Sequence, residues 1–246
     1  MASEPNAIKA GPHQPLVTRG TIFTQSVLGL ILYLLLAVPF LRRAHGLARL
    51  RPPQRHLLVS NHISLLDSLL IAALCWRSGC YPLLVLGDKN VWHTSWVRRL
   101  LSRSTAFLLE RGKLNPNRIQ ELQAFGRAGQ KFQLIVFPEG TRGDGVNVAT
   151  CQPGIYFIAQ AARIPILPVF IENMQLISTK TGRFHLVRGW RKVEVHFGEP
   201  IAPAKYLPMP REEFLEFVRQ SIAGAKTTER GVLKSNRIGS RVNTPD

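Results

Sequence analysis

The chain has 246 residues, and 45% of them are hydrophobic, which is enough for one large domain or two small ones with a buried core. Its 32 Lys and Arg residues against 15 Asp and Glu give a formal net charge of +17. Such an excess indicates anionic partners, namely nucleic acid, an anionic membrane surface or phosphorylated substrates. The chain has three cysteines, Cys75, Cys80 and Cys151, an odd number that includes no CxxC pair. This pattern favours a reduced cytosolic environment and excludes a cysteine metal site.

The first forty residues divide into a polar leader and an apolar stretch. Residues 1–20 contain prolines and glycines without a periodic apolar pattern, which predicts a flexible leader. Residues 22–41 are almost entirely apolar, and a helix needs about 20 such residues to span a bilayer. We therefore assign residues 21–43 to a membrane anchor helix. A helix lying in the interface is an equal alternative to a spanning one, because Gln25 and Ser26 stand near its start.

Two other interpretations of the apolar stretch are weaker. A cleaved signal peptide would end at small residues, whereas this stretch ends at Phe40 and Leu41, followed by two arginines. A soluble helix that is apolar on every side would need protein all round it. Basic residues are concentrated after the stretch, so the positive-inside rule places the following domain and its active site on the cytoplasmic side. The same basic residues can bind anionic lipid headgroups.

Segments with strand and helix character alternate from residue 44 to residue 225. Strands are predicted at residues 57–59, 81–86, 106–109, 132–137, 166–171, 184–187 and 192–197. Helices are predicted at residues 68–74, 91–101, 116–128, 154–162 and 210–223. This order is typical of an α/β domain with a largely parallel central sheet and flanking helices, here preceded by the apolar membrane helix. Residues 226–246 are polar and basic, which predicts a disordered tail.

A histidine and an aspartate lie at the first strand-to-helix turn of this domain. His62 follows the strand at residues 57–59, and Asp67 comes five residues later. Loops at strand ends commonly carry catalytic groups, and the ordinary pKa of imidazole lies near neutrality. Asp67 can accept a hydrogen bond from one ring nitrogen, which fixes the tautomer and leaves the other nitrogen able to accept a proton. The alternative is a helix cap made by Asn61 and Ser64, with Asp67 at the positive end of the helix.

A second polar loop, with the sequence FPEGTR, covers residues 137–142 and follows the most apolar strand of the domain. Gly140 allows a sharp turn or a close approach to a ligand, and Arg142 offers a planar fork that suits phosphate. Lys89 and Arg111 also follow predicted strands. Open α/β sheets bind ligands at the carboxyl ends of their strands, so these three basic residues together predict an anion pocket. Each of them alone is more commonly a solvated surface side chain.

Together, these blocks resemble the glycerolipid acyltransferases, and within them the 1-acylglycerol-3-phosphate acyltransferase family. The blocks are NH-x4-D at residues 61–67, a strand that ends at Arg111, FPEGTR at residues 137–142 and IPILPV at residues 164–169. They come in the family order and cover roughly residues 55–200. The chain departs from the common family pattern at Thr105, Leu108, Glu110 and Gln152, and these departures bear on the acceptor substrate.

The resemblance implies a membrane-bound enzyme that transfers an acyl group from coenzyme A or acyl carrier protein to 1-acylglycerol-3-phosphate (lysophosphatidic acid), giving phosphatidic acid. It implies that His62 is the general base and that Asp67 orients it. The positions expected to bind substrate are Arg111, Glu139, Gly140, Thr141 and Arg142. Lys89 is added to them because it also follows a predicted strand. No metal ion or cofactor is expected besides the acyl donor, because a thioester is already activated.

Three alternatives are open. The same chemistry could serve a lyso-ornithine lipid or another lysophospholipid. A non-catalytic basic protein that binds membranes or nucleic acid would also fit the charge. The aromatic content of 8% and the lack of a recognisable binding motif argue against a nucleic-acid partner. A hydrolase that pairs His62 with a serine nucleophile would need a Gly-x-Ser-x-Gly elbow, which the sequence lacks.

Overall fold

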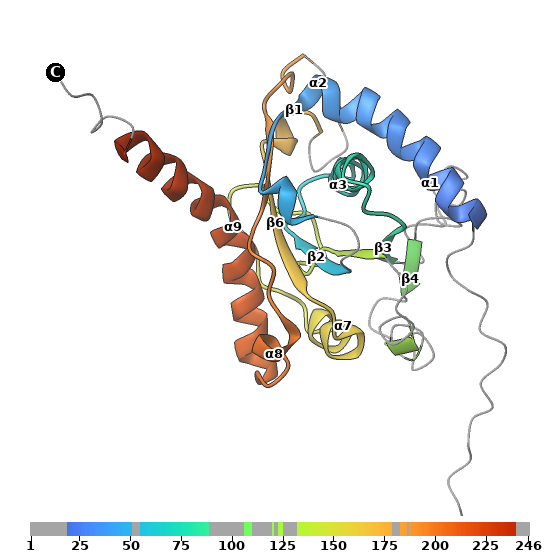
Figure 1. The fold of residues 1–246 in the computed structure, drawn as a ribbon, viewed down its shortest axis with the longest axis vertical. Coiled ribbons are helices and arrows are strands. Elements are labelled where there is room, and N and C mark those ends of the chain that lie inside the picture. Colours follow the sequence, from blue (N-terminus) through green and yellow to red (C-terminus); the bar gives the residue numbers. More distant parts are fainter. Residues whose placement is uncertain are drawn as a thin grey trace, which may run out of the picture.

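A computed structural model of the chain describes residues 19–50, 55–88, 106–109, 120, 123–124, 132–178, 183–185 and 187–239. The helices predicted at residues 91–101 and 116–128 lie wholly or mostly outside these ranges. Figure 1 shows a central sheet with helices on both of its faces. The predicted fold class, a largely parallel α/β sheet with flanking helices after an apolar N-terminal helix, is confirmed.

Seven strands of the described chain form one sheet, in the order β1-β7-β6-β2-β5-β3-β4. Their bounds are β1 Leu41–His45, β2 His56–Ser60, β3 Leu83–Asp88, β4 Ala106–Leu109, β5 Gln133–Val136, β6 Ile166–Glu172 and β7 Val193–Phe197. All neighbours pair in parallel except β6 and β7, which are antiparallel. The strands from β6 to β4 therefore run in one direction, and we call the edge at their carboxyl ends the carboxyl edge.

The middle strand β2 separates two hydrophobic cores. It is buried on both faces, which is why residues 57–59 form a continuous apolar run. The helices that cover the sheet are α3 Leu66–Arg77, α7 Gly154–Ala162, α8 Pro203–Tyr206 and α9 Arg211–Gly239. Successive side chains of a strand point to opposite faces, so Leu57 and Val59 join the core under α7 and α9, and Leu58 joins the core under α3 and the N-terminal helix.

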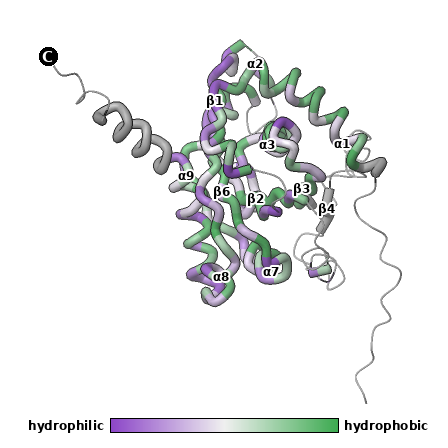
Figure 2. Tube along the Cα trace, in the orientation of Figure 1, coloured by the Kyte–Doolittle hydropathy of each residue, from purple (hydrophilic) through white to green (hydrophobic). Residues whose placement is uncertain are grey.

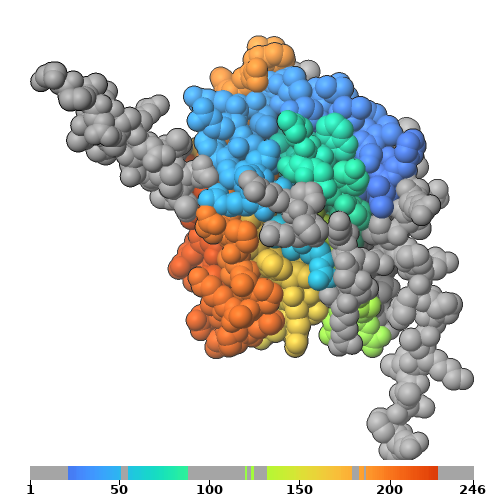
Figure 3. Space-filling model, in the orientation of Figure 1, coloured from blue at the N-terminus to red at the C-terminus, as the bar shows by residue number. Residues whose placement is uncertain are grey.

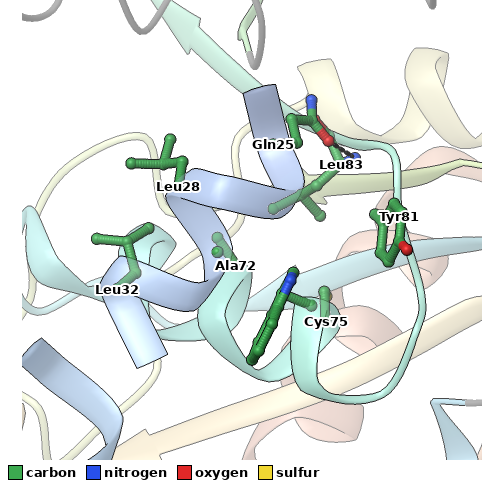
Figure 4. A pocket seen from close by; sticks show the side chains of 9 residues that line it. Gln25, Leu28, Leu32, Ala72, Cys75, Tyr81 and Leu83 are labelled. Carbon is green, nitrogen blue, oxygen red and sulfur yellow. Dashed lines mark hydrogen bonds between the residues drawn. The ribbon is translucent and has the colours of Figure 1, made fainter. Parts of the chain in front are cut away.

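The apolar N-terminal stretch forms a continuous helix that lies across α3. It consists of α1 (Arg19–Leu32), a π-helical turn (Tyr33–Ala37) and α2 (Val38–Phe40). By length and composition, Ile22–Phe40 could cross a membrane. Gln25 joins this helix to β3, because its amide donates to the Leu83 carbonyl at 2.9 Å and its oxygen accepts the Leu83 N–H at 2.8 Å. The same residues line a small pocket between α1 and α3 (Figure 4).

The side of the N-terminal helix that faces away from α3 is apolar and exposed. Its exposed side chains are Ile22, Phe23, Val27, Leu30, Ile31, Leu34, Leu35 and Val38. Figure 2 shows this helix as a largely hydrophobic element on the outside of the fold. A contiguous apolar surface of this kind marks a binding surface for a membrane or another protein.

The prediction of a disordered tail from residue 226 is wrong for residues 226–239, because α9 continues to Gly239. Phe214, Val218, Ile222 and Ala225 recur at helical spacing and are buried, so packing carries the helix beyond the predicted end at residue 223. No proline follows within the helix to stop it, since the next one is Pro245. Residues 240–246 lie outside the described chain.

Three other predicted boundaries differ from the structure. Residues 41–43, assigned to the end of the anchor helix, begin edge strand β1, whose two arginines are exposed. The strand predicted from residue 81 begins at Leu83. The strand predicted at residues 184–187 is wrong, because Phe184 makes only an isolated bridge to Ser178 and Val187 lies in a turn. Its apolar residues suggested a strand, but Phe184 and Val187 are exposed and have no core to pack against.

Candidate active site

Two loops at the carboxyl edge hold the motif residues. One follows β2 and leads into α3, and the other follows β5 and leads into α7. Because β2 and β5 are parallel neighbours, both loops leave the sheet at the same edge (Figure 1). The first loop is fixed to β6 by the buried Asn61 amide, which donates to the Ile171 carbonyl at 2.9 Å and accepts the Ile171 N–H at 2.7 Å.

The His62 ring and the Asp67 carboxylate are hydrogen-bonded. Nδ1 of His62 lies 2.9 Å from Oδ2 of Asp67, and the same oxygen accepts the N–H groups of Ile63 at 2.6 Å and Ser64 at 2.7 Å. A carboxylate oxygen only accepts, so Nδ1 carries the proton and Nε2 keeps a lone pair. Asp67 is fully buried, whereas 19% of the His62 side chain is exposed, so the ring can meet a substrate.

Glu139 joins the two loops. Its buried carboxylate accepts the His62 N–H at 2.9 Å and the Ala149 N–H at 3.2 Å. The Gly143 N–H in turn donates to the His62 carbonyl at 2.6 Å. Burial raises the pKa of Glu139, while the two backbone hydrogen bonds act in the opposite direction. The sequence showed no local partner for this residue, because its partners are backbone groups that any amino acid supplies. Its observed contacts are those of a residue that positions His62.

Phe137 and Gly140 shape the second loop. The Phe137 ring stacks on the His62 ring, with centroids 4.2 Å apart and planes inclined by 23°. Gly140 has a φ of +67°, in the left-handed region, and a Cβ at this position would lie 3.0 Å from the Gln152 side chain. Sequence reasoning assigns no role to Phe137 and considers Asn61 only as a possible helix cap, although each belongs to one of the two motif runs.

The predicted anion pocket is only partly within the described chain. Thr141 is exposed, and Arg142 is half-buried and forms no ion pair with a described residue. Lys89 and Arg111 lie outside the described residues. The structure therefore brings Glu139 and the His62–Asp67 pair together and places Gly140 and Arg142 in the same loop as Glu139.

A second titratable cluster lies on β1 and β7. The side chains of His45, Glu194 and His196 come close enough to hold a metal ion between them. The two imidazole rings stack in parallel, however, with centroids 4.5 Å apart and an interplanar angle of 4°, so their in-plane lone pairs do not converge. Glu194 also pairs with Arg42 at 3.3 Å. These contacts indicate an ion-pair network between β1 and β7, and they argue against a metal site.

The arrangement around His62 suits general base catalysis. Nε2 can take a proton from a hydroxyl group, and the Asp67 carboxylate, which is hydrogen-bonded to the other ring nitrogen, stabilises the imidazolium that forms. A base placed in this way contributes about 10²–10⁴-fold to a rate. The stacked Phe137 and the Glu139 contacts hold the ring and its backbone while the charge changes.

Comparison with known proteins relates the chain to lipid acyltransferases. The family model described as Acyltransferase matches residues 22–172. The chain is 27% identical over 175 residues to the "1-acyl-sn-glycerol-3-phosphate acyltransferase" of Saccharomyces cerevisiae, covering 68% of this chain and 54% of the relative. It is 26% identical over 160 residues to the "Probable 1-acyl-sn-glycerol-3-phosphate acyltransferase" of Mycoplasma pneumoniae, covering 63% of this chain and 60% of the relative. The match thus spans little more than half the length of these curated relatives.

A solved structure has the same fold. The 1-acyl-sn-glycerophosphate (LPA) acyltransferase PlsC from Thermotoga maritima superposes with a TM-score of 0.63 at 21% sequence identity. The alignment covers 86% of this chain and 82% of that chain. At this level of identity the likeness supports the architecture of sheet and helices.

Proposed function

Because this chain belongs to the acyltransferase family, we propose that it transfers an acyl group to the free hydroxyl of 1-acylglycerol-3-phosphate, giving phosphatidic acid. The donor is an acyl thioester of coenzyme A or acyl carrier protein. The observation that carries this proposal is the hydrogen bond between His62 and Asp67 at the carboxyl edge. The names of the curated relatives support the choice of acceptor.

The reaction follows from the chemistry of the pair. Nε2 of His62 takes the proton of the acceptor hydroxyl while the hydroxyl oxygen forms a bond to the thioester carbonyl carbon. The tetrahedral intermediate carries a negative oxygen and collapses with cleavage of the carbon–sulfur bond. The imidazolium then returns its proton to the leaving thiolate, which restores the neutral base. Throughout, Asp67 keeps the ring in one tautomer and offsets its positive charge.

Arg142 is proposed to bind the acceptor phosphate. Arg142 is half-buried, makes no ion pair with a described residue, and stands in the loop that Glu139 fixes to His62. Arginine binds phosphate through paired N–H donors, which also orients the glycerol hydroxyl. Lys89 and Arg111 are proposed to contribute further positive charge, and Gly140 and Thr141 to shape the backbone around the phosphate.

We place the chain at a membrane, with the active site facing the cytoplasm. The apolar exposed side of the N-terminal helix supports membrane contact, and the net charge of +17 supports an anionic lipid surface. Gln25 and Phe40, near the two ends of the helix, are both buried against the domain, which supports a helix that lies in the interface and does not span the bilayer. The basic residues after the helix suit the anionic surface of the cytoplasmic leaflet, which supports the cytoplasmic orientation.

An acceptor panel tests the proposal. Thiol release from acyl-CoA and lipid product are measured with lysophosphatidic acid, a lyso-ornithine lipid and another lysophospholipid. Wild type should prefer lysophosphatidic acid, and Arg142→Ala should erase this preference, because loss of a charged hydrogen-bonding partner costs about 1.5–3 kcal/mol. Arg142→Lys should also be impaired, since lysine keeps the charge but lacks the fork.

The matched control is Arg211→Ala, which removes an exposed arginine at the start of α9 and should leave the preference unchanged. Equal wild-type rates with phosphate-free acceptors would refute the assigned acceptor and leave acyl transfer itself intact. Failure to release thiol with every acceptor, from acyl-CoA and from acylated acyl carrier protein alike, would refute acyl transfer.

A further inference from the structure

A segment between β6 and β7 carries large apolar side chains that are mostly exposed. It covers residues 183–192, of which residues 183–185 and 187–192 are described, and we call it the 183–192 segment. The exposed fraction is 61% for Phe184, 91% for Val187 and 60% for Trp190. Three such side chains within seven residues form a patch that a soluble surface rarely carries without a partner.

The 183–192 segment extends the exposed apolar side of the N-terminal helix. The Trp190 ring meets the Phe40 ring edge-on, with centroids 6.4 Å apart, and the Arg191 N–H donates to the Pro39 carbonyl at 3.0 Å. In Figure 3 the orange atoms of this segment stand beside the blue atoms of the helix. Val38, one residue before Pro39, is among the exposed apolar side chains of the helix. Helix and segment therefore form one continuous apolar surface.

The segment is also strongly basic. Between residues 183 and 192 it carries Arg183, Arg188, Arg191 and Lys192 and no acidic residue. All four of these are exposed. Apolar side chains that alternate with arginine and lysine suit the boundary between acyl chains and anionic headgroups, where tryptophan is also favoured. A partner protein would need one surface that is both acidic and apolar. An anionic bilayer offers negative headgroups next to apolar acyl chains.

The turn that presents these side chains is held in place. The His185 N–H donates to the Ile177 carbonyl at 2.7 Å, and the Lys192 N–H donates to the Gly189 carbonyl at 3.2 Å. Gly189 is buried against Ile177 so closely that a Cβ there would overlap that side chain. The segment is the last part of the connection from β6 to β7 and leads directly into β7. Because β7 runs antiparallel to β6, the segment lies at the carboxyl edge, two strands from β2, whose following loop carries His62.

We propose that the 183–192 segment is a second bilayer contact that inserts Phe184, Val187 and Trp190 among anionic lipids. With the N-terminal helix it turns the carboxyl edge, and therefore the His62 site, towards the membrane surface where a lysolipid acceptor resides. The proposal rests on the proposed function only for the identity of that acceptor. Contact with the bilayer can be measured without turnover, so the two proposals can fail independently.

Site-directed spin labelling of the full chain measures this contact. The native Cys75, Cys80 and Cys151 are buried, and burial raises the pKa of Cys80 to about 11 and that of Cys151 to about 12, so an introduced surface cysteine reacts first. Labels are placed at Val187→Cys and, as the control, at Ala204→Cys, an exposed position on α8 far from the N-terminal helix (Figure 1).

In vesicles of phosphatidylcholine and phosphatidylglycerol, the label at position 187 should become accessible to oxygen and shielded from a water-soluble nickel chelate. The label at position 204 should remain accessible to the chelate. Equal chelate access at both positions would overturn the proposal. Spin–spin broadening at position 187 that disappears on dilution with unlabelled protein would assign the surface to a second copy of the chain, which also overturns it.

A partitioning experiment tests the same contact by mutation. Val187→Asp combined with Trp190→Ser should weaken binding to these anionic vesicles by about tenfold or more while the N-terminal helix is intact. Ala204→Asp is the control and should bind as wild type does. Turnover of a short-chain, water-soluble lysophosphatidic acid should be unchanged in the double variant, because neither side chain belongs to the catalytic pair. Wild-type partitioning of the double variant would contradict the proposal.

Discussion

Two buried carboxylates determine where His62 lies. Asp67 holds the ring by a hydrogen bond to Nδ1, and Glu139 holds the backbone of the same residue by accepting its N–H. Asp67 Oδ2 also accepts two other N–H groups, so the turn before α3 is built around this one oxygen. A charge in this position stabilises both the loop and the imidazolium, and a substitution there therefore affects structure and chemistry together.

Glu139→Ala tests the positioning role. The change leaves the N–H groups of His62 and Ala149 without their acceptor, and a buried unsatisfied donor costs about 1–3 kcal/mol. We expect a lower free energy of unfolding and a lower kcat, with little change in the KM for the acyl donor. Denaturant unfolding and steady-state kinetics measure these quantities. Glu213→Ala, on the exposed start of α9, is the control, and a Glu139→Ala enzyme that matches it in both assays would contradict the role.

Sequence reasoning predicted which residues of the candidate site lie together better than it predicted how they are held there. The spacing of His62 and Asp67 predicted their hydrogen bond, because a residue five positions on can fold back at a helix start. The loop at residues 137–142 was expected to face the same edge, since both loops follow parallel strands. The contacts of Glu139 and Asn61 could not be predicted, because they join side chains to backbone groups of distant residues.

At the scale of secondary structure, the N-terminal helix is part of the domain as well as an apolar surface. Leu36 and Phe40 belong to the core under α3, and Gln25 is bonded to β3. Gly29 allows the close approach of α1 to α3 at Trp76. This packing orients the exposed apolar side of the helix relative to the sheet, and it therefore determines how the carboxyl edge would face a membrane in the proposed arrangement.

Gly29→Ala tests the packing of this helix. An added Cβ would come within 2.5 Å of the Trp76 Cβ, so α1 must move away from α3. Overpacking of this kind costs about 1–3 kcal/mol, and we expect a lower unfolding midpoint in detergent. The control is Gly154→Ala in α7, where nothing lies within 4 Å of the new Cβ. That change should raise stability by about 0.4–1 kcal/mol, so equal midpoints for the two variants would disprove the packing argument.

The elements most accurately predicted from the sequence are those in which most residues are buried. The helix at residues 154–162 and the strands β2 and β6 follow from apolar runs bounded by turn residues. Edge strand β1 was missed because its two arginines point outward and only its pairing with β7 makes it a strand. The segment around Val187 was misassigned because its hydrophobic residues face outward. Apolar residues alone do not indicate whether a core or an external surface receives them.

At the scale of the whole molecule, buried histidines couple stability to pH. Burial lowers the pKa of His56 and of His196, and the neighbouring His45 acts in the same direction on His196, while Glu172 and Glu194 oppose it. In the unfolded chain a histidine titrates near about 6.5. The unfolded state therefore binds more protons below that pH, and the stability that these groups provide is complete above it and is lost as the pH falls. Burial of Glu139 acts in the opposite sense at lower pH, because its pKa is raised.

We therefore expect the free energy of unfolding to decrease between pH 7 and pH 5. His196→Gln should reduce the slope of this decrease, because glutamine does not titrate. Lys205→Gln, an exposed position on α8, should leave the slope unchanged. Denaturant unfolding at a series of pH values measures the slope, and an identical slope in His196→Gln and wild type would rule out the contribution of this histidine.

The most direct measurement compares acyl transfer to lysophosphatidic acid by wild type and by His62→Ala, both bound to anionic vesicles. Wild type should release one thiol from acyl-CoA for each phosphatidic acid formed. His62→Ala should lose about 10²–10⁴-fold in turnover while it still folds and binds the vesicles, because the hydroxyl no longer has a base. Asp67→Asn should also fall steeply, whereas Asp144→Asn, an exposed carboxylate in the second loop, should not. A folded, vesicle-bound His62→Ala protein with turnover near that of wild type would contradict the central claim.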